Sequence, residues 1–219
     1  MDSIINVLSF DCANKSLGVS IFTYNKNFQK DINNVLESNI ENIDKLININ
    51  DIINNSINIL YLDVIDVLPD LKVSEVSLLD RTKAFKSVIL QINDIVDKYL
   101  KGQKINICIE YQPVFNDKSR TICNQLIYEY TLKENYEIHI VNPSLKNKIY
   151  FTEELKHNLF LAKYNSNYKA NKNHTKSNFL YFIKVYNLDN LIKKIKKSNL
   201  DDIADSLLQG FAFIKYIYK

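Results

Sequence analysis

Two β-rich apolar runs, residues 4–10 and 18–24, stand close together at the start of the chain, and only a short polar connection, CANKSL, separates them. Alternating and β-branched residues favour strands, and so short a connection suits a hairpin but not a crossover helix. A third apolar run, residues 57–67, predicts another strand. We therefore expect the chain to begin with three antiparallel strands.

After residue 67 the hydrophobic pattern alternates between helical and extended spacing. Apolar stripes at helical spacing predict three helices, and shorter apolar runs predict two more strands. These elements, in chain order, are a helix at 78–100, a strand at 104–110, a helix at 119–133, a strand at 136–141 and a helix at 201–218. The order predicts an α/β fold, with a mixed sheet flanked by helices.

The length of 219 residues favours a single domain, residues 1–219. Two segments do not fit the compact pattern and are expected to be insertions. Residues 25–56 are rich in asparagine and show no clear period, whereas residues 142–200 are basic. The basic segment holds twelve lysines and three acidic residues, which gives it a net charge of +9. Because the whole chain carries +3, the rest of the chain has a net charge of −6.

The basic segment also contains many aromatic residues, a combination that suits a polyanion because lysine neutralises phosphates and aromatic rings stack on bases. A solvated lysine-rich surface, with the aromatic residues in the core, explains the same composition. Within the segment, residues 171–179 (NKNHTKSNF) are expected to be either a DNA-contacting loop or a disordered tether.

Several classes of protein are disfavoured. No stretch approaches the roughly 18 apolar residues of a membrane helix, and the first residues lack the features of a signal peptide, so we expect an intracellular protein that does not cross a membrane. The cysteines, Cys12, Cys108 and Cys123, lack CxxC spacing and are expected to be reduced core residues. P-loop, GxGxxG, HExxH and nucleophile-elbow motifs are all missing.

Two carboxylates stand at the ends of predicted strands. Asp11 follows an apolar run and shares a strand face with Val7 and Ser9, and Glu110 closes the strand 104–110. Each acid, taken alone, is explained as a strand-end or turn-capping residue. Together at one end of a sheet, they form part of a candidate site.

A third group of acids, Asp201, Asp202 and Asp205, lies at the start of the last helix. Ser198 and Asp201 fit a capping pattern, so Asp201 has a structural explanation. Asp202 and Asp205 share a helix face, and so do Asp201 and Asp205, so spacing alone does not choose between the two pairs. All three acids also complement the positive end of a helix dipole. Like charges on adjacent turns are destabilising unless a cation lies between them.

Carboxylates gathered at one sheet end suit phosphodiester cleavage with two metal ions. Carboxylate oxygens hold Mg²⁺ while leaving positions for water and phosphate, and paired ions stabilise the attacking and leaving oxygens. The sequence therefore predicts a metal-dependent nuclease site.

Four stretches together resemble a known family: SFDCANKSLGVSIF, ICIEYQPVFNDKSRTI, VNPSLKNK and KSNLDDIADSLLQGF. They are similar to the RuvC-like Holliday junction resolvases of poxviruses and other large DNA viruses. The resemblance implies an RNase H-like fold and an endonuclease that resolves four-way DNA junctions symmetrically, in viral genome processing. It also implies a homodimer, branched DNA as the partner, and the host-cell cytoplasm or a viral factory as the location.

The resemblance also implies roles for particular residues. The residues that match the family's metal ligands and catalytic acids are Asp11, Glu110, Asp202 and Asp205, which leaves Asp201 as a cap. Its cofactor is Mg²⁺, two ions per site, with Mn²⁺ able to substitute. The resemblance places Gln112, Lys146 and Lys148 near DNA. Asn14 and Lys15, in the connection after the first strand, are expected either to reach phosphate or simply to turn the chain. Two alternatives stay open: a flap or RNA/DNA-hybrid nuclease of the same fold, and a noncatalytic DNA-binding replication protein.

Overall fold

The computed structural model describes residues 3–28, 30, 31, 34, 52, 56–68, 76–112, 117–149 and 168–218, with the backbone alone for 168–171. Most of the predicted insertion at 25–56, and residues 150–167 of the one at 142–200, lie outside these ranges. Both insertions therefore remain predictions.

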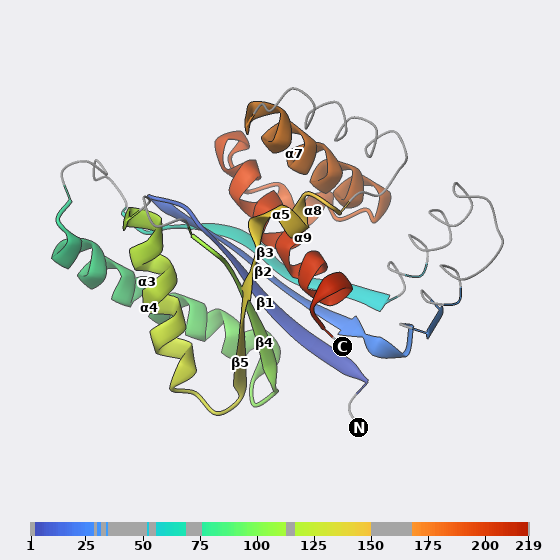
Figure 1. Ribbon diagram of the computed structural model, residues 1–219, viewed down its shortest axis with the longest axis horizontal. Helices are drawn as coiled ribbons and strands as arrows, with labels where there is room; N and C mark the ends of the chain where they lie inside the picture. Colours follow the sequence, from blue (N-terminus) through green and yellow to red (C-terminus); the bar gives the residue numbers. More distant parts are fainter. Residues whose placement is uncertain are drawn as a thin grey trace.

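Five strands of the described chain form one mixed sheet (Figure 1). They are β1 (Ile4–Cys12), β2 (Ser16–Asn25), β3 (Ile57–Asp66), β4 (Ile105–Glu110) and β5 (Tyr136–Val141). The order across the sheet is β3-β2-β1-β4-β5. β1, β2 and β3 pair antiparallel, as the short connection between the first two predicts, whereas β4 and β5 join parallel to β1. β1 is therefore the central strand.

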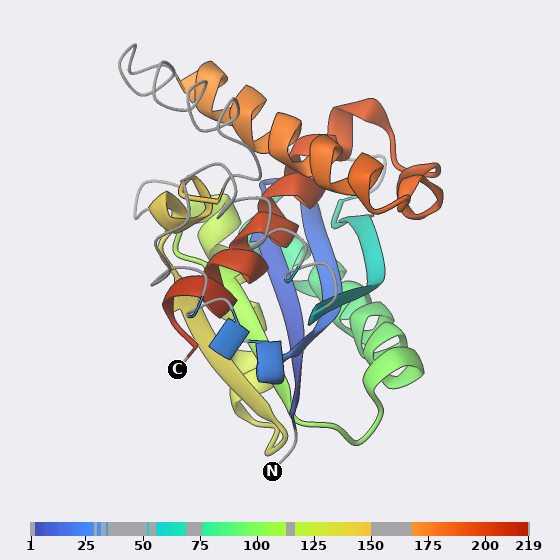
Figure 2. The ribbon, with the colours of Figure 1, turned by 90° about the vertical axis from the view of Figure 1, so that its right-hand side faces the viewer.

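Helices cover both faces of the sheet (Figures 1 and 2). α3 (Leu78–Leu100) and α4 (Asp117–Thr131) lie on one face, and α9 (Leu200–Tyr216) lies across the other, with α7 (Tyr168–Val185) packed on α9. The short elements are η1 (Lys26–Phe28), α5 (Pro143–Lys146), α8 (Asp189–Ile192) and η2 (Lys197–Asn199). The predicted α/β class and element order are confirmed.

Strand alternation divides the apolar side chains between two cores. Leu8, Phe10 and Ile107 point toward α3 and α4, while Val7 and Cys108 point toward α9. The faces predicted from period-two alternation are therefore correct, and Asp11 lies on the α9 side, as its spacing from Val7 requires. All three cysteines are buried free thiols, which confirms the expectation of reduced core residues.

The prediction for residues 171–179 is wrong, because they form part of helix α7 rather than a loop or tether. Asparagine and threonine favour helices weakly, so local propensity gives little sign of this helix. Phe179 and Phe182 are buried on one side of it, and the Phe182 ring centroid lies 5.1 Å from that of Phe211 in α9. Tertiary packing thus stabilises the helix.

Within the described part of the chain, no helix combines the length and apolar character needed to cross a membrane.

Candidate active site

Asp11 and Glu110 come together because their strands are parallel neighbours. β1 and β4 pair with Phe10 opposite Ile109, so the next residue of each strand reaches the same sheet edge. Asp205, in the second turn of α9, approaches from above this edge. The three side chains each offer an oxygen, and these oxygens all lie within 4.8 Å of one another. The structure therefore assembles three of the four predicted acids into one cluster, here called the acid triad.

The fourth predicted acid, Asp202, lies beside the acid triad but outside it. It lines a pocket together with the three acids of the triad, and its Oδ2 accepts a hydrogen bond of 2.5 Å from the hydroxyl of Ser16 at the start of β2. Asp202 and Asp205 thus both face the pocket, which is the pair that the resemblance implied.

Asp201 does not cap α9, and that prediction is wrong. The 3₁₀ turn η2 runs directly into α9, and its last residue, Asn199, stands at the N-cap without a side-chain capping bond. The hydroxyl of Ser198 donates to Asn199 Oδ1 instead. Asp201 pairs with α7, where Lys176 Nζ lies 3.3 Å and Lys172 Nζ 4.0 Å from its carboxylate oxygens.

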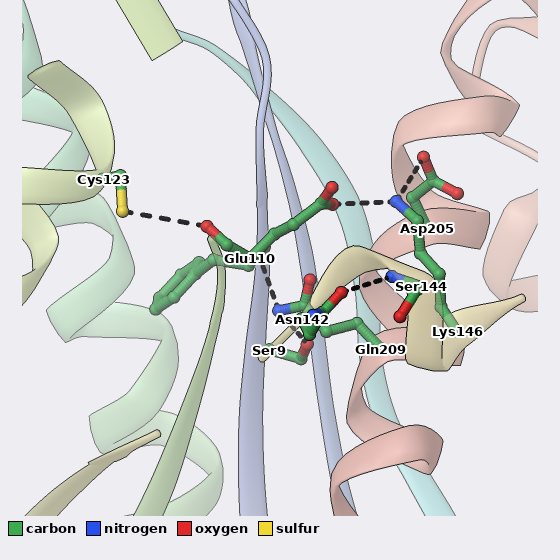
Figure 3. A network of polar contacts seen from close by, with 9 residues as sticks. Ser9, Glu110, Cys123, Asn142, Ser144, Lys146, Asp205 and Gln209 are labelled. Atoms are coloured by element: carbon green, nitrogen blue, oxygen red, sulfur yellow. Dashed lines mark hydrogen bonds and ion pairs between the residues drawn. The ribbon is translucent and has the colours of Figure 1, made fainter. Parts of the chain in front are cut away.

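Lys146 is buried beside the acid triad, and its side chain reaches Glu110 and Asp205 (Figure 3). Its Nζ lies 2.8 Å from Glu110 Oε2 and 2.9 Å from Asp205 Oδ2. The short helix α5 carries it there: Asn142 caps the helix by accepting from Ser144 N–H, and Pro143 stands in the first turn, where its lack of an N–H costs nothing. The residue expected near DNA is thus in direct contact with the acid triad.

Burial and like charges act together on the carboxyl groups. Burial raises the pKa of Asp11 well above its usual value; Lys146 opposes this rise, and Glu110 and Asp205 add to it. Burial also raises the pKa of Asp205 against the opposing charge of Lys146. For Lys146 itself, burial disfavours the ammonium, but the negative charge of Asp205, Asp11 and Glu110 outweighs burial and raises its pKa. One ammonium faces three carboxyl groups, so the site favours additional positive charge.

A set of buried hydrogen bonds, here called the polar seam, joins α9 to β1 and β2. Ser206 Oγ donates to the carbonyl of Ser9 at 2.7 Å and lies 3.0 Å from Ser20 Oγ. Gln209 Nε2 donates to the carbonyl of Phe10 at 3.1 Å. Apolar contacts alone would tolerate sliding of α9. These directional hydrogen bonds fix the rotation of α9 about its own axis and its position along the strands. The polar seam thereby holds Asp205 opposite Asp11.

Sequence reasoning missed the polar seam. The available signal was the placement of polar residues on the buried face of an otherwise apolar helix, and of two serines inside apolar strands.

A pocket of about 360 Å³ opens above the acid triad. Among the residues predicted to lie near DNA, Asn14, Gln112 and Lys146 line it. On the far side, Lys172 and Thr175 of α7 complete the wall, so the helix missed by the sequence reasoning contributes to the site.

The other two predicted DNA contacts lie outside the pocket lining. Lys15 is half-exposed at the tip of the β1–β2 hairpin, 3.9 Å from Asp66. Lys148 is exposed, with its Nζ 5.9 Å from the ring centroid of Tyr216 at the end of α9.

The orientation of Asn14 follows from two contacts made by the helices below it. Ser119 Oγ donates to Asn14 Oδ1 at 2.8 Å, and the buried Arg81 donates to the Asn14 carbonyl. Because the amide oxygen of Asn14 accepts from Ser119, the amide has a defined orientation, and its NH₂ group lies on the side away from the Ser119 hydroxyl.

The donor set fits a divalent cation. Asp11, Glu110 and Asp205 offer the hard carboxylate oxygens that such ions prefer, at mutual distances short enough for one ion to contact all three. The excess of carboxylates over ammonium groups also favours a cation. The acid triad is therefore a candidate metal centre.

No protein-family model matches the sequence, and no curated protein matches it. Among solved structures, the chain is similar to the fowlpox virus resolvase, solved in complex with its substrate Holliday junction DNA, at 16% identity and a TM-score of 0.55; the match covers 98% of this chain and 100% of that one. It also matches T. thermophilus RuvC in complex with a Holliday junction substrate, at 10% identity and a TM-score of 0.49, over 98% and 97% of the two chains. The match to the fowlpox virus resolvase confirms the fold that the sequence resemblance implied: the chain shares the fold of that protein over nearly its whole length.

Proposed function

We propose that the protein is a metal-dependent, structure-selective endonuclease that resolves four-way DNA junctions by hydrolysing phosphodiesters. The observation that carries this proposal is the convergence of Asp11, Glu110 and Asp205 within 4.8 Å at the floor of a pocket. The fold agrees with it, since the fowlpox virus protein with the same fold is described as a resolvase bound to Holliday junction DNA.

Four residues are proposed to hold the metal: Asp11, Glu110, Asp205 and, beside them, Asp202. The proposed ion is Mg²⁺, two per site, with Mn²⁺ able to substitute, because every proposed ligand atom is a carboxylate oxygen. A bound divalent ion stabilises the developing charge on the phosphate and lowers the pKa of the attacking water.

The side chains around the acids have separate tasks. Lys146 places a positive charge beside Glu110 and Asp205, which offsets the repulsion between the acid triad and an incoming phosphate. Asn14 and Gln112 line the pocket and present polar groups to a DNA backbone. Lys172 adds a further lysine side chain from α7. The strand ends and the polar seam keep the acids in place, because a metal centre needs ligands on rigid elements.

Symmetric cleavage of a four-way junction requires two active sites, so the proposed active form is a homodimer. Each protomer would cut one of two opposed strands.

Cleavage of defined DNA substrates tests the proposal. A synthetic four-way junction, a flap, an RNA/DNA hybrid and a linear duplex of matched sequence are incubated with the protein and Mg²⁺. We expect paired, symmetric nicks in the junction and little cutting of the duplex. Preferential cutting of the flap or hybrid would support the rival nuclease functions. An intact junction at high protein concentration, beside an active control nuclease, would contradict the proposal.

A noncatalytic DNA-binding protein is disfavoured by the acid triad itself. One buried and two partly buried carboxyl groups within 4.8 Å of one another are costly to keep unless a cation or chemistry uses them.

A further inference from the structure

The start of β2 lies in unusually close contact with the first turn of α9. A Cβ atom added at Gly18 would lie 2.2 Å from the carbonyl oxygen of Asp202, closer than any real contact. Gly18 also pairs with Asp11 across the β1–β2 ladder, and the same added atom would lie 3.4 Å from Asp11 Cβ. Glycine thus permits the α9 backbone to rest on β2 directly beside Asp11.

Two residues earlier, Ser16 contacts the Asp202 side chain. Its hydroxyl donates a hydrogen bond of 2.5 Å to Oδ2. Ser16 and Asp202 are separated by 186 residues, so the bond joins two independent elements at the pocket wall. One carboxylate oxygen of Asp202 is thereby held by the protein, which restricts the rotation of the whole group.

The contrast with Asp205 shows why such a partner matters. Asp205 is oriented by Lys146 and lies within the acid triad, whereas Asp202 is outside it. A carboxylate at the edge of a metal site binds an ion well only if its orientation is restricted in advance, and groups that hold ligands in this way affect metal affinity strongly.

We propose that Ser16 is a positioning residue, whose hydroxyl orients Asp202 for binding a divalent cation beside the acid triad. The inference rests on the proposed function, since it assigns Asp202 to the same metal centre. Gly18 complements Ser16 by letting α9 approach β2 closely enough for the bond to form.

Three variants test this role: Ser16→Ala removes the hydroxyl, Ser16→Thr retains it, and Ser87→Ala is the matched control. Ser87 lies on the exposed side of α3, where its hydroxyl donates to the Ala84 carbonyl, on the opposite face of the sheet from α9. Binding of Mn²⁺ alone is measured by calorimetry on the full chain without DNA, and junction cleavage is measured across a range of Mg²⁺ concentrations.

For Ser16→Ala we expect Mn²⁺ affinity to fall about 10- to 100-fold, and the Mg²⁺ concentration for half-maximal cleavage to rise by a similar factor, while the maximal rate changes little. Ser16→Thr should restore both values, and Ser87→Ala should match the wild type. Unchanged Mn²⁺ affinity in Ser16→Ala would overturn the proposal, and so would a loss of affinity that Ser16→Thr fails to restore.

A second comparison separates positioning from a general structural effect. In an Asp202→Asn background, Ser16→Ala should cause no further loss of Mn²⁺ affinity, because the carboxylate it orients is gone; a full additional loss would overturn the proposal. The calorimetric result does not depend on nuclease activity. A wild type that binds Mn²⁺ but leaves the junction intact therefore contradicts the proposed function, while the effect of Ser16→Ala on binding still decides the inference.

Discussion

The Nζ atom of Lys146 lies 2.8 Å from Oε2 of Glu110, although the two residues are 36 positions apart and come from different elements. The same ammonium lies 2.9 Å from Asp205, so a single buried lysine pairs with two members of the acid triad. A cation bound at the acid triad would therefore act on the same negative charge as Lys146.

Replacing Lys146 with methionine should make the stability of the protein more dependent on metal. Breaking a buried ion pair from one side leaves uncompensated carboxylates and costs about 3–5 kcal/mol. A divalent cation supplies the missing charge, so Mg²⁺ should raise the melting temperature of Lys146→Met by more than that of the wild type. Thermal unfolding with and without Mg²⁺ measures this, with Lys133→Met, two residues beyond the end of α4, as the control. If Mg²⁺ raised the melting temperature of Lys146→Met and of the wild type by the same amount, the account would be contradicted.

The raised pKa of Asp11 predicts a pH dependence of stability in the metal-free protein. Because the folded state holds the Asp11 proton more tightly than the unfolded state, stability from this group falls as pH rises from the ordinary carboxyl value of 3.8 through the raised pKa of the folded state. Asp11→Asn lacks this titration. Relative to wild type, the variant should therefore gain free energy of unfolding as pH rises through this window.

Denaturant unfolding of both proteins at a series of pH values, in the presence of a chelator, gives the difference directly. Parallel stability curves for wild type and Asp11→Asn would show that Asp11 has no raised pKa.

The three aspartates of α9 should respond differently to substitution by asparagine. Asp205→Asn and Asp202→Asn remove proposed ligands and should each lower junction cleavage at least about 100-fold, since a bound metal contributes several kcal/mol to catalysis. Asp201→Asn breaks only the partly exposed pairing with Lys172 and Lys176, worth at most about 1 kcal/mol of stability, and should cut nearly normally. Single-turnover rates on one junction rank the variants. Loss of cleavage in Asp201→Asn alone would reverse the assignment of the pair.

Two glycine substitutions should separate strain from site geometry. Gly18→Ala forces β2 and α9 apart, with an overpacking cost of about 1–3 kcal/mol. Gly102→Ala meets open space but forces alanine to a φ of +73°, at about 1–2 kcal/mol. Both variants should lose stability, whereas only Gly18→Ala should lose cleavage, because only Gly18 borders Asp11 and Asp202. Unfolding free energies and cleavage rates at low temperature check this, and equal cleavage by the two variants would argue against it.

The strands and the acids at their ends could be predicted from the sequence for a simple physical reason. Period-two alternation places Asp11 on the face that α9 covers, and parallel neighbours bring Glu110 to the same edge. Both features are local, because they depend on spacing within a strand and on the order of elements.

What the sequence could not reveal depends on contacts between distant elements. The bonds from Ser16 to Asp202 and from Ser206 to Ser9 each join residues more than 180 positions apart, and no local period encodes them. Helix α7 was missed because packing on α9 stabilises it despite weak local propensity. Lys146 was noticed only as a basic residue, since its position depends on how α5 approaches the acid triad after β5.

Junction cleavage by wild type and Asp11→Asn, each with Mg²⁺ and with chelator, tests the central claim most directly. Wild type should introduce paired nicks in opposed strands of a four-way junction only with Mg²⁺. Asp11→Asn should still bind the junction in a gel-shift assay but leave it intact, because the variant loses a metal ligand and one negative charge that repels phosphate. Normal cleavage by Asp11→Asn, or cleavage by wild type in chelator, would contradict a metal-dependent nuclease built on the acid triad.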